Sequence, residues 1–416
     1  MDMDVEETLC DLLRRTEFAL QLDESTLPGN EALLLAYVRF IKDEQLMQEF
    51  YLQESLALTL RNIIAVVIDG APSMVGCYRG FVSYLKQVVP EVMTVHCVIH
   101  RQHLAAKHLS PRLNESLQYV ISAVNRIRSS CLKDRLFRQL CDEKDDEYNR
   151  LLLYTEVPWL SRSACLTRFY ELFKTVLSFF ADEDVSLRDI LKLRQADIAY
   201  LADLYEKFNA MNLQLQVGNL NLMKTKSVIS AFVSKLALYK RNISRGELCQ
   251  FPKLAELKRC PDPCDQDIEV YSEHLEMLHE ELKRRFHDVL SMVVPNWVID
   301  PLASDEDAEL HLQEELVELQ SNDEFKPRLR QGYAAFWLQK QIPILYPRLS
   351  YVVKRLLIAF PSSSLVERCF SVVTDLLTKK RNRLQVVNRG NLRLRVTGIE
   401  PDIEKLARLH GRHHTS

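Results

Sequence analysis

The clearest signal in the hydrophobic pattern is an uninterrupted apolar run from Ile63 to Ile68. Every residue in it except Ala65 is β-branched, which is typical of a strand buried on both faces, as central parallel strands are. Asp69 follows the run directly, and Gly70 to Pro72 then turn the chain. A second apolar strand is predicted from Val92 to His96. An acid at the carboxyl edge of a parallel strand lies where open α/β sheets bind ligands, although it can also simply cap the turn.

Strict alternation marks the region before this run. Phe18, Leu20 and Leu22 alternate within a strand predicted from Glu17 to Asp23. Two more strands are predicted from Leu33 to Ile41 and from Met47 to Gln53. Short polar turns join the three, so they should form an antiparallel meander. A short helix, Glu6 to Arg15, precedes them.

Beyond the second apolar strand the spacing becomes helical, with apolar residues three and four positions apart. A sequence of helices is predicted over Pro111 to Cys141, from Trp159 onward, and over Asp189 to Phe208, Leu220 to Tyr239 and Asp267 to Leu290. The segment from Asp300 to Glu324 has ten acidic residues and no Lys or Arg, which favours a solvated linker. Two final helices, Leu349 to Ile358 and Ser362 to Leu377, are expected to pack back on the N-terminal sheet. The chain is therefore divided into 1–175, an all-α insertion over 176–335, and 336–416.

Composition narrows the class of protein. The 416 residues suffice for two or three domains, and the net charge of −3 gives no overall footprint for nucleic acid, so DNA contacts would need local patches. Of the ten cysteines only Cys260 and Cys264 are closely paired, and a loop is the favoured interpretation for them. The N-terminus is acidic where a signal peptide needs positive charge, and no run is long enough for a membrane span. We expect an intracellular protein with reduced thiols that is neither secreted nor membrane-bound.

Several motifs resemble those of the hAT superfamily of DNA transposases, in particular domesticated vertebrate relatives of BED-finger transposases. They occur in the family's order and span more than 350 residues: QLDEST from Gln21, VVIDGAPSMVG from Val66, HCVIHRQHLAAK from His96, WLSR from Trp159, and FPSSSLVERCFSVVTDLLTKKRNRL from Phe360. No Cys-x2-Cys…His array precedes Glu17, so we expect no BED finger in this sequence.

The resemblance implies an α/β ribonuclease H-like core with a mixed sheet, interrupted by the large all-α insertion and helix-rich overall. It also implies a catalytic and metal-binding set of two aspartates and a glutamate, which falls on Asp23, Asp69 and Glu367. Such a set would hold Mg²⁺ or Mn²⁺, since these ions prefer carboxylate oxygens. One departure is the short connection from Ser55 to Ile63, because a crossover to a parallel strand normally needs about a dozen residues or more. We expect a strained crossover or a remodelled sheet edge.

Two of these acids also have purely structural interpretations. Asp23 precedes a turn and could bond its own backbone. Ser364 and Glu367 have the spacing of a capping box.

Cys97 and His100, with His96 and His103 nearby, invite a zinc interpretation. Structural zinc usually draws two pairs of ligands, and no second pair is evident, so we favour a packed, hydrogen-bonded role for this motif.

The DNA-binding candidates come from two places. Trp159 and Arg162 lie in the motif that the family carries before its insertion, where the tryptophan is linked to handling a flipped or hairpin DNA end; a core aromatic is the alternative. Lys379, Lys380, Arg381 and Arg383 form the densest basic cluster, which could neutralise phosphates or complement a helix end.

These observations lead to two functional hypotheses. The first is a domesticated transposase-derived nuclear factor, possible also in the cytoplasm, that binds DNA or protein and self-associates through Leu349 to Leu394 without transposition. The alternative is a metal-dependent transposase or nuclease that uses the three acids. No small-molecule substrate and no membrane partner is indicated.

Overall fold

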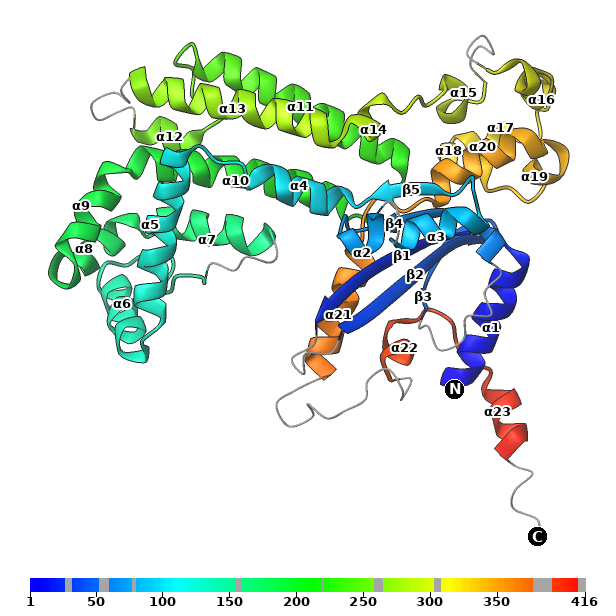
Figure 1. Ribbon diagram of the computed structural model, residues 1–416, viewed down its shortest axis with the longest axis horizontal. Helices are drawn as coiled ribbons and strands as arrows, with labels where there is room; N and C mark the ends of the chain where they lie inside the picture. Colours follow the sequence, from blue (N-terminus) through cyan, green and yellow to red (C-terminus); the bar gives the residue numbers. More distant parts are fainter. Residues whose placement is uncertain are drawn as a thin grey trace. The chain divides into compact units, whose positions relative to one another are not determined.

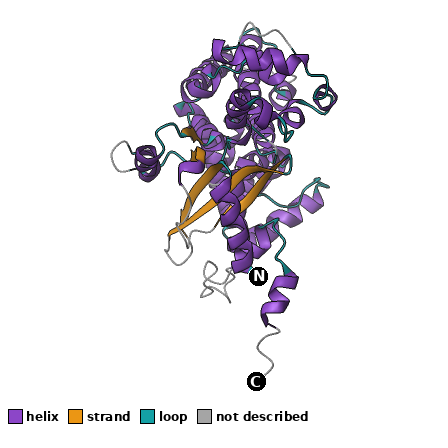
Figure 2. Cartoon of the chain, turned by 90° about the vertical axis from the view of Figure 1, so that its right-hand side faces the viewer, coloured by secondary structure: helices purple, strands orange, loops and turns teal. Residues whose placement is uncertain are grey.

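A computed structural model describes residues 1–26, 32–51, 60–76, 80–153, 159–218, 220–257, 265–302, 308–376 and 391–410. It is helix-rich with one five-stranded mixed sheet (Figures 1 and 2). The chain divides into two compact units. The first contains Met1–His100, Gly218–Lys226 and Ser291–Ser416, and the second contains Arg101–Val217 and Ser227–Leu290. Their bounds differ from the sequence divisions at 175 and 335, which stay predictions about domains.

The sheet lies in the first unit and has the strand order β3-β2-β1-β4-β5. Its strands and the helices among them are α1 (Asp2–Arg15), β1 (Phe18–Thr26), β2 (Ala32–Lys42), β3 (Gln45–Tyr51), the 3₁₀ turn η1 (Leu60–Asn62), β4 (Ile63–Ile68), α2 (Pro72–Val75), α3 (Phe81–Val88) and β5 (Met93–His96). β1 pairs with β2 and β2 with β3 in antiparallel fashion, while β4 is parallel to both β1 and β5. The meander and the two parallel strands therefore have the predicted order.

The connection that precedes β4 was expected to strain the crossover or remodel the sheet edge. Residues 52–59 lie outside the described part of the chain. Where the structure describes the strands, β3 pairs with β2 from Ala36–Tyr51 to Lys42–Gln45, and β4 pairs with β1 with one register shift between Phe18 and Ala19. Apart from that shift, the strand pairing on both sides of this connection is therefore regular in the described residues.

The two faces of the sheet differ in chemistry because alternate residues of a strand point to opposite sides. Phe18, Leu20 and Leu22 of β1 join a hydrophobic core that includes Leu9 and Leu13 of α1. The opposite face displays Gln21 and Asp23. It is packed against two helices. Helix α20 (Pro347–Ile358) contacts β2 and β4, and helix α21 (Ser364–Leu376) contacts β1 and β2.

The C-terminal part of the chain belongs to the same unit as the sheet. Its remaining helices are α15 (Asn296–Ile299), α16 (Leu310–Ser321), α17 (Lys326–Leu329), α18 (Tyr333–Trp337), α19 (Ile342–Leu345), α22 (Asn391–Val396) and α23 (Ile403–His410). Arg393 of α22 is 3% exposed and pairs with Asp2 at 2.9 Å and Glu6 at 3.0 Å on α1. The two ends of the chain are therefore joined by a buried cation between two acids.

The solvated linker expected over Asp300 to Glu324 was wrong for the residues described there. Helix α16 forms within it, and Leu312, Leu316 and Leu319 are buried in a core with Trp297 and Trp337. The acids lie on the remaining sides of the helix, so the three- and four-residue spacing of the leucines decided the structure and the charge run did not.

The second unit is built of helices. Helix α4 (Val98–Ala106) enters it and is followed by α5 (Pro111–Arg128), α6 (Cys131–Glu143), α7 (Trp159–Glu171), α8 (Phe173–Glu183), α9 (Val185–Leu193), α10 (Gln195–Leu215), α11 (Leu222–Ile243), α12 (Pro252–Leu257), α13 (Asp265–Arg285) and α14 (His287–Ser291). The helix predicted over Asp189 to Phe208 is in fact two, with a break at Arg194. Helix α10 is buried on most of its sides and contacts α5, α7, α12 and α13, so it is the centre of this unit.

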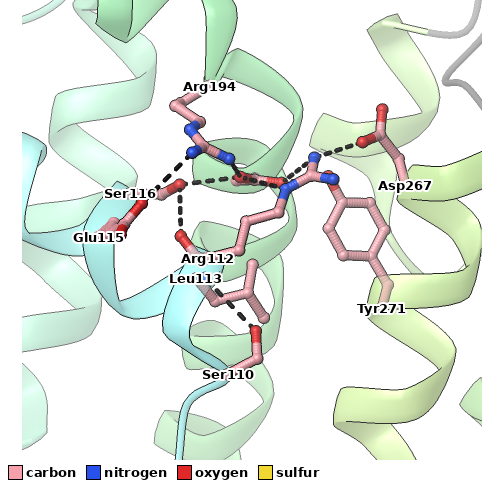
Figure 3. A network of polar contacts seen from close by, with 9 residues as sticks. Ser110, Arg112, Leu113, Glu115, Ser116, Arg194, Asp267 and Tyr271 are labelled. Atoms are coloured by element: carbon pink, nitrogen blue, oxygen red, sulfur yellow. Dashed lines mark hydrogen bonds and ion pairs between the residues drawn. The ribbon is translucent and has the colours of Figure 1, made fainter.

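A buried carboxylate ties α5, α10 and α13 together (Figure 3). Asp197 of α10 is fully buried, and its two oxygens accept hydrogen bonds from Arg112 at 2.8 and 3.0 Å. Ser116 and the hydroxyl of Tyr271 also donate to it, at 2.8 and 2.9 Å. The arginine and the two hydroxyl donors supply the interactions that this charge loses on leaving water.

Replacing Asp197 by Ala should destabilise the protein by about 3 kcal/mol, because Arg112 loses its buried partner and keeps only Asp267, and the hydroxyl of Tyr271 loses its acceptor. Urea unfolding followed by circular dichroism measures this. Glu115→Ala is the matched control, since Glu115 pairs with Arg194 at the surface of the same network and its loss should cost below about 1 kcal/mol. Equal effects of the two substitutions would contradict the account of the network.

Candidate functional site

The candidate site lies at the carboxyl edge of the parallel strands β1 and β4. The last residue pair between them is Gln21 with Val67, and Asp23 and Asp69 each follow two residues later. Because residues two apart share a face, both carboxylates emerge on the side of the sheet that α20 and α21 cover. Asp69 follows β4 directly, as expected. Asp23, expected at the end of its strand, lies inside β1, where it is still paired with Leu35 of β2.

The turn after Asp69 requires a glycine. Oδ1 of Asp69 accepts hydrogen bonds from the amides of Gly70 at 3.2 Å and Ala71 at 3.1 Å, so this acid also has the turn-capping role considered from the sequence. Gly70 has a φ of +146°, and a Cβ built there would lie 2.4 Å from Nε2 of His96. A larger residue at position 70 would push against that histidine and shift the turn that holds Asp69.

Glu367 comes to this edge from the far end of the sequence. It lies in the first turns of α21, a helix that contacts β1 and β2. The segment before α21 is held on the residues that directly follow β5: the amide of Val98 donates to the carbonyl of Pro361 at 3.1 Å, and the amide of Ser363 donates to Sγ of Cys97 at 3.3 Å. Oε1 of Glu367 accepts a hydrogen bond from the hydroxyl of Ser363 at 3.2 Å. The capping-box spacing predicted Ser364 as the partner of Glu367, whereas in the structure the partner is Ser363.

Electrostatic interactions show that the three carboxyl groups are near one another. Burial, together with the negative charges of Glu367 and Asp69, raises the pKa of Asp23 to about 7. Burial also raises the pKa of Glu367, although that residue stays exposed over part of its surface. The structure therefore brings the three predicted acids together at a position that solvent reaches, and Asp23 binds its proton close to neutral pH.

The donor set suits a hard divalent cation, since it offers carboxylate oxygens from three different elements. Among the described residues, the oxygens of Asp23, Asp69 and Glu367 do not all fall within 4.8 Å of one another, so a cation would have to draw them inward. The set that meets this distance is Glu276, His279 and Glu280 on α13, where Lys240 already pairs with Glu276 at 2.5 Å.

The environment of Cys97 fits a packed thiol better than a zinc ligand. Cys97 is fully buried, and its Sγ accepts from the amide of His100 at 3.5 Å in addition to Ser363. Burial, and after it the charge of Glu367, raises the pKa of the thiol to about 11, whereas zinc binds the thiolate.

The predicted DNA contacts are described only in part. Trp159 begins α7, but its side chain is outside the described part of the structure. Arg162 is 4% exposed in the second unit, which leaves little of its guanidinium for a phosphate. Lys379, Lys380, Arg381 and Arg383 lie outside the described residues.

Two polar residues of the site were missed in the sequence. Ser363 is 1% exposed and contacts both Cys97 and Glu367. Gln21 is completely buried two residues before Asp23 on the same face, and neither of its amide atoms has a hydrogen-bond partner among the residues that the structure describes. The alternation of Phe18, Leu20 and Leu22 was the signal that placed Gln21 beside Asp23. No such signal marked Ser363, whose partner Cys97 is 266 residues away.

The raised pKa of Asp23 should appear in the pH dependence of stability. An unfolded aspartate has a pKa of about 3.9, so between about pH 4 and 7 the folded state holds a proton that the unfolded state has lost. The free energy of unfolding should therefore fall as pH rises through this window. Asp23→Asn should flatten that slope relative to Glu24→Gln, an exposed neighbour, in urea unfolding at several pH values. An unchanged slope in Asp23→Asn would contradict the assignment.

The chain was compared with known protein families. The family model described as the FAM200/GTF2IRD2 helical domain matches residues 96–244. The matched range begins at the last residue of β5 and runs through α4 to α11. The described residues after His96 in this range form helices and their connections, in agreement with that description. Among the helices that the structure describes, none combines the length and apolar character needed to cross a bilayer. Over this range the chain is therefore similar to the FAM200/GTF2IRD2 helical domain.

Proposed function

We propose that this chain is a domesticated hAT transposase-derived protein with a ribonuclease H-like core, and that it works in the nucleus as a self-associating DNA- or protein-binding factor without transposition. The matched helical domain supports the first part, because its family is linked to domesticated hAT-like transposases.

One observation carries the derivation from a transposase. Asp23 and Asp69 come from adjacent parallel strands before the helical unit, and Glu367 comes from α21 after it. The sequence motifs imply this arrangement. It combines a sheet of order β3-β2-β1-β4-β5 with a set of three acids, the last of which follows an inserted helical unit. A packed core needs no such meeting of three like charges, which adds to the effect of burial in raising the pKa of Asp23 and makes its ionisation costly.

Self-association would use the faces of α20 and α21 that do not contact the sheet, since Leu349, Val353 and Val366 are already buried within the unit.

A second candidate function is a metal-dependent DNA nuclease or strand transferase, which the convergence of the carboxylates favours. Asp23, Asp69 and Glu367 would hold Mg²⁺ or Mn²⁺, and the ion would act as a Lewis acid on a phosphodiester. Cation binding and transposition are separable properties, so a protein that no longer transposes can still bind the ion.

Cleavage of DNA ends separates the two functions. Wild type and Asp69→Asn are incubated with labelled duplex ends and Mg²⁺ or Mn²⁺, with Glu24→Gln as the matched control. The proposal expects the same background in all three proteins. Cleavage by wild type and Glu24→Gln that disappears in Asp69→Asn would contradict it and support the enzyme.

Self-association is tested by sedimentation velocity of the full chain at micromolar concentration. The proposal expects a species of twice the chain mass, and Tyr351→Glu, which places a charge on the exposed side of α20, should shift it toward the monomer. Leu193→Glu, at an exposed position in the second unit, should leave it unchanged. A monomer at all concentrations would contradict this part of the proposal.

A further inference from the structure

A buried contact between Cys97 and Ser363 adjoins the carboxylate of Glu367. Cys97 has no exposed surface and Ser363 is 1% exposed. The hydroxyl of Ser363 is 3.1 Å from Sγ of Cys97 and 3.2 Å from Oε1 of Glu367. Ser363 therefore links the end of the sheet to an acid of the candidate site.

The single hydrogen of the Ser363 hydroxyl decides which groups donate and which accept in these contacts. A serine hydroxyl has one hydrogen, so it cannot donate to the sulfur and to the carboxylate at once. An ionised carboxylate only accepts and is the stronger acceptor, so the hydroxyl donates to Glu367. The thiol, which its raised pKa keeps protonated, then donates to the oxygen of Ser363. The direction of the bonds runs from Cys97 through Ser363 to Glu367.

Ser363 is held in this position twice by one sulfur. Its amide and its hydroxyl lie 3.3 and 3.1 Å from Sγ of Cys97. The hydroxyl that faces Glu367 is therefore positioned by a buried group and not by solvent.

We propose that Ser363, held in place by Cys97, is a positioning residue that sets the direction of the Glu367 carboxylate and thereby the affinity of the acid cluster for a divalent cation. This proposal rests on the carboxylate site described above. Residues that support metal ligands from behind typically change metal affinity by about 10- to 100-fold when removed.

The alternative is that Ser363 only helps to begin α21. The chain offers a matched control for that role: Ser362 is similarly buried, at 4% exposure, and its hydroxyl bonds to Ser364 without touching an acid. A loss specific to position 363 therefore reports on the carboxylate and not on the start of the helix.

The test is Mn²⁺ binding to the full chain, followed by the electron paramagnetic resonance signal of the free ion, with melting temperatures recorded in parallel. Wild type should bind Mn²⁺, and Asp69→Asn should abolish the binding. Ser363→Ala should weaken it by about tenfold, Ser363→Thr should restore it, and Ser362→Ala should match wild type. Cys97→Ala keeps the hydroxyl but loses its support, so it should weaken binding several-fold.

The outcomes separate this proposal from the one it rests on. Wild type without saturable Mn²⁺ binding would overturn both the cation site and the role of Ser363. Binding by wild type that is unchanged within twofold in Ser363→Ala, or lowered equally in Ser362→Ala, would overturn the role of Ser363 alone. If Ser363→Ala does not fold, unchanged binding by a folded Cys97→Ala has the same consequence.

Discussion

The parallel pairing of β1 with β4 is the constraint on which the candidate site depends. It places Asp23 and Asp69 on one face, just beyond the last residue pair that the two strands share. Charges so close together oppose each other, and protein around them removes the water that would screen them. The cost appears as the pKa of about 7 at Asp23. The rest of the first unit, from the meander to the C-terminal helices, holds this edge in place.

Bringing Glu367 to that edge depends on neutral hydrogen bonds rather than on a salt bridge. Pro361 and Ser363 are fixed to the turn after β5 through the amide of Val98 and the sulfur of Cys97. Because these contacts are buried hydrogen bonds, they fix where α21 begins relative to the sheet. The helical unit between the two halves of the site then needs no contact with the carboxylates, because the chain re-enters the first unit before it reaches α15.

Much of the sheet could be predicted from the sequence, because local alternation and the β-branched run at Ile63–Ile68 report directly on burial. The meeting of the three acids came from motif resemblance, since no local pattern relates residue 23 to residue 367. Two errors had physical causes. The many acids around α16 led to the prediction of a linker, although the leucine spacing there is helical. Ser363 was not predicted because its position depends on the sulfur of Cys97, which is distant in sequence.

The central claim is that residues from both sides of the helical unit form one carboxylate cluster. Carbon-13 NMR of the labelled Asp23 carboxyl group, titrated in wild type and in Glu367→Gln, tests it most directly. The account predicts that the pKa of Asp23 falls when the charge of Glu367 is removed, while the exposed neighbour substitution Glu24→Gln leaves it in place. A pKa of Asp23 that is the same in wild type and Glu367→Gln would contradict the convergence of these residues.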